Sequence, residues 1–264
     1  MKIFISADIE GTAGITSWDE TNKGHADYTY FSKQMTAEVK AAISGAMKAG
    51  ASEILIKDAH GSARNIDPSV LPDSVRIIRG WARDPFMMMQ GIDGSFDAVV
   101  FTGYHSPSGR GLNPLSHTMT GDIFSLKING ELVSEFLMNA MSAAYYKVPA
   151  VFLSGDSGIV KIARDKVPGI ETVVTNTGSG SSVDSIHPAK AVGLIEEGVS
   201  RAISNGSIKP ITLPEKFEAE IVYIEHTHAH RLSFFPGVEK VDDRTLTFTE
   251  SDYFEVLRKL LFLL

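Results

Sequence analysis

Short apolar strand-like segments alternate with helical segments along most of the chain, and this alternation constrains the fold more than any other feature. The patterns predict strands at 2–8, 52–58, 74–80, 97–104, 149–156 and 171–176. They predict longer helices at 31–50, 134–146, 157–167 and 188–206, and a short helix at 84–92. Strands that alternate with helices favour an α/β fold with a mainly parallel, Rossmann-like sheet flanked by helices.

The pattern changes in the C-terminal part of the chain. Segments 217–225, 238–241 and 244–250 are expected to be strands, and 251–264 a final helix. Its apolar end can belong to the core or to a subunit contact, and the contact is favoured. We therefore expect an α/β metal-binding catalytic domain over residues 1–209 and a smaller β-rich lobe over residues 210–264. This lobe contains three alternating histidines, expected to share one face of a solvated or oligomer-facing strand end: His226, His228 and His230.

Two loop segments carry local signals. Asn129-Gly130 between two apolar runs predicts a β-hairpin. The segment NTGSGSS at 176–182 resembles a phosphate-binding loop but lacks the lysine, so we expect a flexible connector.

Composition excludes several classes of function. A chain of 264 residues with 43% apolar and 22% charged residues is expected to fold into a globular domain. The net charge of −7 and the lack of a basic cluster argue against nucleic acid and anionic membranes as partners. The chain has no cysteine, so disulfides and thiolate ligands are excluded. No signal-peptide pattern or long apolar segment is visible, and a cytoplasmic location is the expectation.

Acidic and imidazole side chains gather where the predicted strands end. Asp8 and Glu10 end the first strand, and their alternate spacing places both carboxylates on one face. Their mutual repulsion requires a nearby positive charge or a bound proton. Later strand ends and the segments after them add Asp58, His60, His105, His117, Glu131, Glu135 and Asp156. Carboxylates and imidazoles without thiols are a ligand set typical of zinc hydrolases, and parallel strands bring such ends to one edge.

Each of these residues also has a structural explanation when it is taken alone. An isolated strand-end aspartate such as Asp8 is often a turn former, and single histidines such as His60 and His105 are usually structural. Asp58 is expected to orient a neighbouring ligand, and Asp156 is evenly balanced between a helix cap and a site residue. Their convergence at several strand ends of one sheet favours the metal site.

The motifs SADIEGTAG, KDAHG, GYHS, LSHTM and GELVSEFLMNA resemble, in this order, those of the zinc-dependent D-aminopeptidases of the DppA type. The resemblance extends to about residue 195 and continues more loosely beyond it. It implies two zinc ions per chain, with Glu135 rather than Glu131 as a ligand because the family's glutamate precedes an apolar-Leu-Asn-Ala run. Glu131 is then a surface hairpin residue. The ligands that the resemblance implies are Asp8 as the bridging carboxylate, Glu10 and His60 on one ion, and His105 and Glu135 on the other.

The same resemblance implies a catalytic His117 and a metallo-aminopeptidase that uses a water molecule activated by two zinc ions. Its substrates would be short peptides or amino-acid amides with an N-terminal D-residue, and the family implies a homo-oligomer, a decamer. One alternative is another two-metal hydrolase, such as a phosphoesterase or amidase, although only Arg64 and Arg110 lie near the motifs to clamp a phosphate. A non-catalytic binding module is a further alternative, but no G-x-G-x-x-G follows the first strand.

Overall fold

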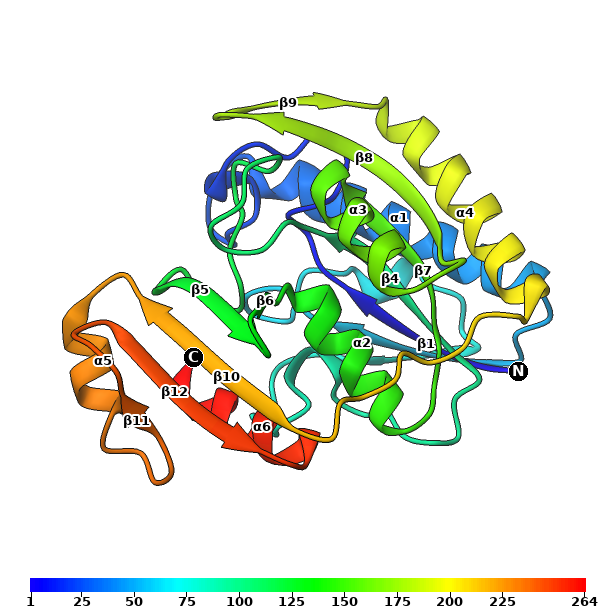
Figure 1. The fold of residues 1–264 in the computed structure, drawn as a ribbon. Helices are drawn as coiled ribbons and strands as arrows, with labels where there is room; N and C mark the ends of the chain where they lie inside the picture. Colours follow the sequence, from blue (N-terminus) through cyan, green and yellow to red (C-terminus); the bar gives the residue numbers. More distant parts are fainter.

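The computed structural model describes residues 1–264 and contains a seven-stranded and a five-stranded sheet, each with its own hydrophobic core (Figure 1). The larger sheet has the order β3-β2-β1-β4-β7-β8-β9. Neighbouring strands are parallel except for β8 and β9, which confirms the predicted mainly parallel α/β sheet. Its strands are β1 (Lys2–Ala7), β2 (Glu53–Asp58), β3 (Val75–Ile78), β4 (Ala98–Tyr104), β7 (Ala150–Asp156), β8 (Glu171–Ser179) and β9 (Ser182–Ser185).

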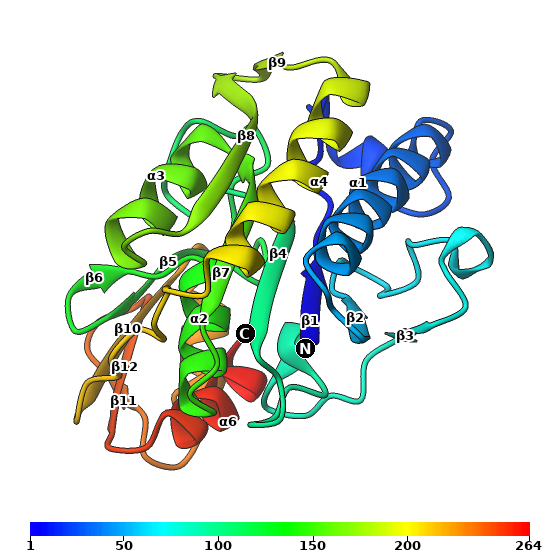
Figure 2. The ribbon, with the colours of Figure 1, turned by 90° about the vertical axis from the view of Figure 1, so that its right-hand side faces the viewer.

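Helices flank this sheet on both faces. Helices α1 (Tyr28–Lys48) and α4 (Pro188–Asn205) lie side by side over one face, and α2 (Glu135–Tyr145) and α3 (Ser157–Lys166) cover the other (Figure 2). Helix α1 buries an apolar stripe with helical spacing, including Met35, Val39 and Ile43, against the strands. None of the helices is both long enough and apolar enough to cross a bilayer.

The second sheet is antiparallel and has the order β11-β12-β10-β5-β6. Its strands are β5 (Ile123–Ile128), β6 (Glu131–Leu132), β10 (Phe217–Tyr223), β11 (Glu239–Lys240) and β12 (Thr245–Glu250). Helices α5 (His226–Leu232) and α6 (Tyr253–Leu263) accompany it, and the 3-10 turns are η1 (Trp18–Glu20), η2 (Pro68–Val70) and η3 (Met87–Met89). Because β5 pairs with β10 from the C-terminal part and β6 pairs with β5, the chain enters this sheet twice. A domain boundary at residue 209 stays a prediction.

Helix α2 lies between the two cores and is buried on all sides. Its Phe136 packs in the core of the larger sheet, whereas Leu137 and Met138 pack in the core of the smaller one. The Tyr253 hydroxyl of α6 donates a hydrogen bond to the Met138 carbonyl at 2.7 Å. This double burial explains why the helix carries apolar residues on opposite faces.

The hairpin prediction is confirmed, whereas two other local predictions are wrong. Asn129 and Gly130 have φ angles of 52° and 78°, as a type I′ turn between β5 and β6 requires, and Glu131 beside them is exposed. The segment 176–182 is not a flexible connector, because β8 continues through it and pairs with β9. The short helix expected at 84–92 is reduced to the single turn η3.

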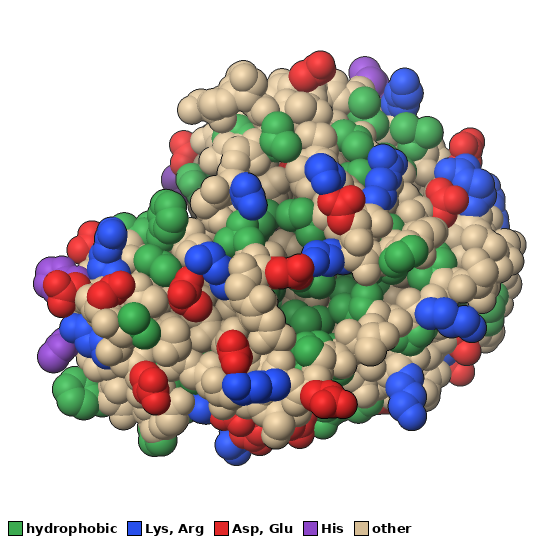
Figure 3. Space-filling view, viewed as in Figure 1, with side chains coloured by type: hydrophobic (Ala, Val, Ile, Leu, Met, Phe, Trp, Pro, Cys, Tyr) green, Lys and Arg blue, Asp and Glu red, His purple; other side chains and the backbone are tan.

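The histidine segment forms helix α5 instead of a strand. Strand β10 loses its partner after Ile224, whose N–H donates to the Asp122 carbonyl, so the following backbone groups bond to one another. Figure 3 shows histidine side chains at the edge of the molecule where Figure 1 places α5, and intermixed positive and negative side chains elsewhere. The apolar C-terminal end belongs mainly to the smaller core, not to the surface, because Leu257, Leu260 and Leu263 are buried.

Candidate metal centre and active site

The strand order of the larger sheet reverses between β1 and β4. From β1 the sheet grows through β2 to β3, and from β4 it grows in the other direction through β7 to β8. Open α/β sheets bind ligands outside the carboxyl ends of the strands at such a switch point. Asp8 and Glu10 follow β1 and His105 follows β4, so these predicted site residues lie at this point.

Two glycines let the segment after β1 pass directly against the end of β4. The Gly11 N–H donates to the Gly103 carbonyl at 2.8 Å, and a Cβ on Gly11 would lie 1.8 Å from the Tyr104 carbonyl oxygen. Gly103 has a φ of 70°, and a Cβ there would lie 2.2 Å from the Asp8 carbonyl oxygen. This backbone contact brings the acidic end of β1 to the imidazole that follows β4.

The structure brings all six predicted site residues together. Five are buried, and the sixth, His117, lies on a loop with 15% of its side chain exposed. His60 Nδ1 lies 3.0 Å from Glu10 Oε1 and 3.4 Å from Asp8 Oδ1. The other predicted residues lie on the far side of the Asp8 carboxylate.

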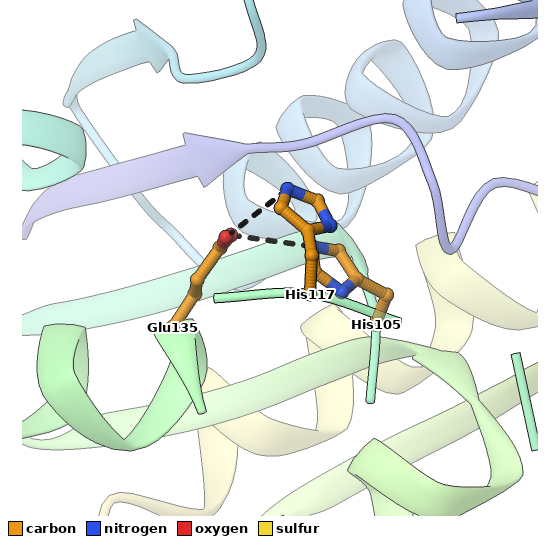
Figure 4. Close-up of side chains that lie close together, drawn as sticks. All are labelled: His105, His117 and Glu135. Carbon is orange, nitrogen blue, oxygen red and sulfur yellow. Dashed lines mark ion pairs between the residues drawn. The ribbon is translucent and has the colours of Figure 1, made fainter. Parts of the chain in front are cut away.

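Glu135 and two imidazoles form that other half of the site (Figure 4). His105 Nε2 lies 3.4 Å from Asp8 Oδ2 and 3.3 Å from Glu135 Oε2. His117 Nε2 lies 3.5 Å from Glu135 Oε1, and its ring stacks on His105 with centroids 4.3 Å apart. Ser134 caps α2 by accepting the Leu137 N–H, and this cap fixes the helix start that carries Glu135. Asp8 therefore lies between two groups of ligand-type side chains.

Each imidazole is oriented by a hydrogen bond to the backbone. A carbonyl oxygen can only accept, so the ring nitrogen that faces it carries the proton and the other nitrogen faces the carboxylates. Such outer hydrogen bonds are typical of metal-binding histidines. The three bonds run from His60 Nε2 to Thr21 O at 3.0 Å, from His105 Nδ1 to Ser106 O at 2.9 Å, and from His117 Nδ1 to Leu115 O at 2.9 Å.

Several buried polar atoms of the site have no hydrogen-bond partner. They are Asp8 Oδ2, both carboxylate oxygens of Glu10, and His105 Nε2. His60 and Glu10 lie close together, but their atoms are not aligned for a hydrogen bond. A buried carboxylate without a hydrogen-bond partner costs folding free energy. The ligand-type atoms instead form two overlapping groups, each within 4.8 Å: Asp8, Glu10 and His105, and His105, His117 and Glu135. Oxygen and imidazole donors that converge in this way fit divalent cations such as zinc.

The charges of the site are strongly coupled. Burial opposes the charged form of His60, yet Glu10 and Asp8 raise the pKa of its imidazole well above the usual value. Burial likewise opposes the charged form of His105, yet Glu135 and Asp8 raise its pKa. Burial favours the neutral form of Glu10, but the neighbouring His60 outweighs it and lowers the pKa of that carboxyl group. The carboxylates therefore demand positive charge, which a divalent cation supplies in place of protons.

A buried polar network ties together the elements that carry these residues. Asn139 Nδ2 donates to the Tyr104 hydroxyl at 3.0 Å, and the Ser6 hydroxyl donates to the Met88 carbonyl at 3.0 Å. The Tyr104 hydroxyl is then left to donate to Ser6 Oγ at 2.7 Å. Ser6, Tyr104 and Asn139 each lie one to four residues from a candidate ligand on the same stretch of chain. The network therefore fixes the relative positions of β1, β4 and α2 beneath the site.

Two further strand-end aspartates position loops. Asp58 accepts the N–H groups of Asn65 and Ile66, at 2.6 and 2.9 Å, and so fixes the loop that follows His60. Asp156 caps α3 and also accepts the Ser106 N–H at 2.6 Å. Asp156 is therefore a helix cap.

A cleft of about 420 Å³ lies beside the candidate ligands. Its wall includes residues that the sequence patterns did not single out: Trp81, Arg83, Met87, Met119 and Leu261. Trp18 packs edge-on against His117 with ring centroids 5.2 Å apart. Both tryptophans of the chain thus contact or line the site. In the sequence, the one signal that could have pointed to this cleft wall is the presence of large aromatic residues in polar segments.

Comparison with known proteins agrees with this geometry. A family model described as D-aminopeptidase matches residues 1–262. The D-aminopeptidase of Bacillus subtilis (strain 168) is 31% identical over 266 residues, covering 99% of this chain and 96% of that protein. The structure described as "Zn-dependent D-aminopeptidase DppA from Bacillus subtilis, a self-compartmentalizing protease" superposes with a TM-score of 0.94 at 30% identity, covering 100% of this chain and 96% of that one. The chain therefore belongs to the peptidase M55 family of D-aminopeptidases, which are hydrolases of peptide bonds.

Proposed function

We propose that this chain is a two-zinc aminopeptidase that releases an N-terminal D-residue from short peptides or amino-acid amides. The observation that carries the proposal is the set of buried, unpartnered carboxylate and imidazole atoms that converge around Asp8. The proposed ligands are Asp8 as the bridge, Glu10 and His60 on one ion, and His105 and Glu135 on the other. The relative of known structure is itself described as zinc-dependent.

Charge balance favours two ions over one. Asp8, Glu10 and Glu135 are all buried, and with a single divalent ion one of these carboxylates would be balanced only by a protonated imidazole, which could not then bind a metal. Uncompensated buried charge is strongly destabilising. The position of Asp8, with one oxygen near His60 and the other near His105, also suits a carboxylate shared by two cations.

When bound, two zinc ions supply a water nucleophile activated at neutral pH and polarise the scissile carbonyl. The chain itself orients the histidine side chains through hydrogen bonds to backbone carbonyls, and it transfers protons. His117 is suited to the proton transfer, because its Nδ1–H is held by Leu115 and its Nε2 faces the site. It accepts a proton from the attacking water and returns it to the leaving amine.

His117 also lies within one of the two ligand-type groups, which gives it a rival role as a third ligand beside His105 and Glu135. Two features favour the catalytic role. His117 is the most exposed of the six residues and comes from a loop, so a proton carrier can move there without displacing the buried ligands.

The substrate class and assembly follow the relatives. The curated relative is a D-aminopeptidase, and we propose the same preference for an N-terminal D-residue. The solved relative is described as self-compartmentalizing, and we propose a homo-oligomer, a decamer, in the cytoplasm for this chain. Light scattering of the purified protein measures the assembly directly.

Metal analysis combined with a substrate comparison tests the function. The purified protein is loaded with zinc, desalted and assayed for metal per chain. It is then assayed with D-alanine p-nitroanilide, its L-enantiomer and p-nitrophenyl phosphate. We expect close to two zinc ions per chain and hydrolysis of the D-anilide above both others. Preferred hydrolysis of the phosphate ester would support a phosphoesterase instead.

A further inference from the structure

Arg83 is the only lysine or arginine that lines the cleft beside the candidate metal ligands. The rest of the wall beyond those ligands is largely apolar, with Trp81, Met87 and Leu261 among its residues. Arg83 itself forms no ion pair and no side-chain hydrogen bond within the chain. Resting on the proposed function, we propose that Arg83 is a specificity-determining residue that binds the C-terminal carboxylate of a dipeptide substrate.

The loop that carries Arg83 is fastened to the segment after β2. The Gly80 N–H donates to the Ala63 carbonyl at 2.8 Å, and Trp81 Nε1 donates to the Gly61 carbonyl at 2.7 Å. The buried Lys57 side chain donates a hydrogen bond to the Gly80 carbonyl, and its ammonium group lies 4.3 Å from the centre of the Trp81 ring. Gly61 directly follows a candidate zinc ligand, so the loop is held at a fixed place relative to the metal site.

Backbone strain is concentrated in the wall of this cleft. Arg83 has a φ of 59°, and Met87 and Met119 have φ angles of 47° and 63°. Residues other than glycine rarely adopt this left-handed backbone conformation. It persists where the surrounding structure enforces it, often at ligand sites. A glycine at position 83 would relieve the strain but would offer no side chain to the cleft.

Charge explains why a cationic group belongs at this position. Asp8 and Glu135 line the same cleft, and the proposed zinc ions offset their charge, so Arg83 is the cationic side chain of the wall that stays available to a substrate carboxylate. An aminopeptidase substrate with two residues carries that carboxylate close to the scissile bond, because one residue spans about 3.3–3.6 Å. The planar guanidinium of Arg83 matches a carboxylate through two parallel hydrogen bonds. The wall therefore offers a substrate carboxylate a cationic partner apart from the metal ligands.

A second hollow with cationic side chains offers an alternative binding place for the substrate carboxylate. Arg64 and Lys23 line a separate hollow of about 370 Å³ on the other side of His60, with no hydrophobic residue in its wall. This hollow is polar throughout, whereas the Arg83 cleft is the one that also contains Asp8, His117 and Glu135. The Arg83 cleft therefore places a bound peptide beside both halves of the metal site.

The test compares D-alanylglycine with D-alanylglycinamide on the zinc-loaded protein. Both contain the same scissile bond, glycine has no handedness, and only the first carries the carboxylate. We expect kcat/KM to favour the acid, and Arg83→Gln to reduce this preference about ten- to a hundredfold, mainly through KM. Arg83→Lys should restore part of it. Arg76→Gln, on the exposed side of β3, is the matched control and should leave the preference unchanged.

Each alternative result has one meaning. An unchanged acid preference in Arg83→Gln, or its loss in Arg64→Gln instead, overturns the assignment of Arg83 while the hydrolysis itself stands. No hydrolysis of either peptide by the zinc-loaded wild type overturns the proposed function and this inference with it. Should Arg83→Gln fail to fold, Arg83→Gly decides, because it relieves the left-handed strain and should raise the unfolding temperature while losing the acid preference.

Discussion

Glu38 is a buried carboxyl group that makes the stability of this fold depend on pH. Its Oε1 accepts the Ala13 N–H and a Gln34 side-chain N–H, both at 3.0 Å, while Oε2 has no hydrogen-bond partner. Burial, only partly opposed by these hydrogen bonds, raises the pKa of Glu38 to about 7. Since Ala13 follows Glu10 by three residues, Glu38 also supports the segment that carries a candidate zinc ligand.

The direction and size of the effect follow from linkage between protonation and folding. The ordinary pKa of 4.5 applies to the unfolded chain. Between pH 4.5 and 7 the unfolded chain loses a proton that the folded chain keeps, so the free energy of unfolding falls as pH rises. A pKa difference of about 2.5 corresponds to about 3.4 kcal/mol in full, and to about 2.5 kcal/mol between pH 5 and pH 8.

Glu38→Gln removes this titration while keeping an oxygen for the Ala13 N–H. Urea unfolding of wild type and variant at pH 5 and pH 8, at one fixed zinc concentration, measures the stability difference. We expect the free energy of unfolding of the variant, relative to that of the wild type, to increase by about 2.5 kcal/mol from pH 5 to pH 8. Contributions from zinc binding cancel in this difference. Glu53→Gln, at the exposed start of β2, is the control. A stability difference that does not change with pH would refute the reasoning.

The other predictions concern the metal site and its scaffold. Asp8→Ala should lose both zinc ions by elemental analysis, since Asp8 is the proposed bridge; two ions retained per chain would disprove that role. His117→Ala should keep its zinc but lose about a hundredfold or more in kcat, and loss of one ion instead would make His117 a ligand. Gly11→Ala should lower the free energy of unfolding by about 1–3 kcal/mol in thermal or chemical unfolding, because its Cβ would meet the Tyr104 carbonyl. Gly111→Ala, where a Cβ meets nothing within 4 Å, is the matched control.

The sequence was informative where structure follows from local periodicity. Alternating strands and helices predicted the parallel sheet, and strand ends rich in Asp, Glu and His predicted an edge where ligand-type side chains meet. That prediction was possible because the direction of parallel strands alone places their ends together. The choice of Glu135 over Glu131 came from the family resemblance. Asp58 behaved as a loop-holding residue and Glu131 as an exposed hairpin residue, again from local chemistry.

The remaining features depend on contacts between distant segments, which periodicity does not encode. Trp18 lies in the short turn η1, where it packs against His117. Arg83 lies in a loop whose position is set by tertiary hydrogen bonds, such as that from Trp81 to Gly61. The pairing of β5 with β10 joins segments about ninety residues apart, so the extent of the second sheet was not predictable. The histidine segment has alternating polar residues that suit a strand, yet it is helical because no partner strand is available after Ile224.

The two-sheet architecture has a direct consequence for the site. The proposed ligands come from the larger sheet and from the start of α2, whereas Met119 and Leu261 of the cleft wall are associated with the smaller core. Helix α2 is buried between both cores and is tied to α6 by the bond from Tyr253 to Met138. Because packed interiors transmit displacements, we expect a cavity in the smaller core to shift α2 and with it Glu135. The C-terminal strands and α6 thus belong to the working part of the site, even though none of the proposed ligands lies in them.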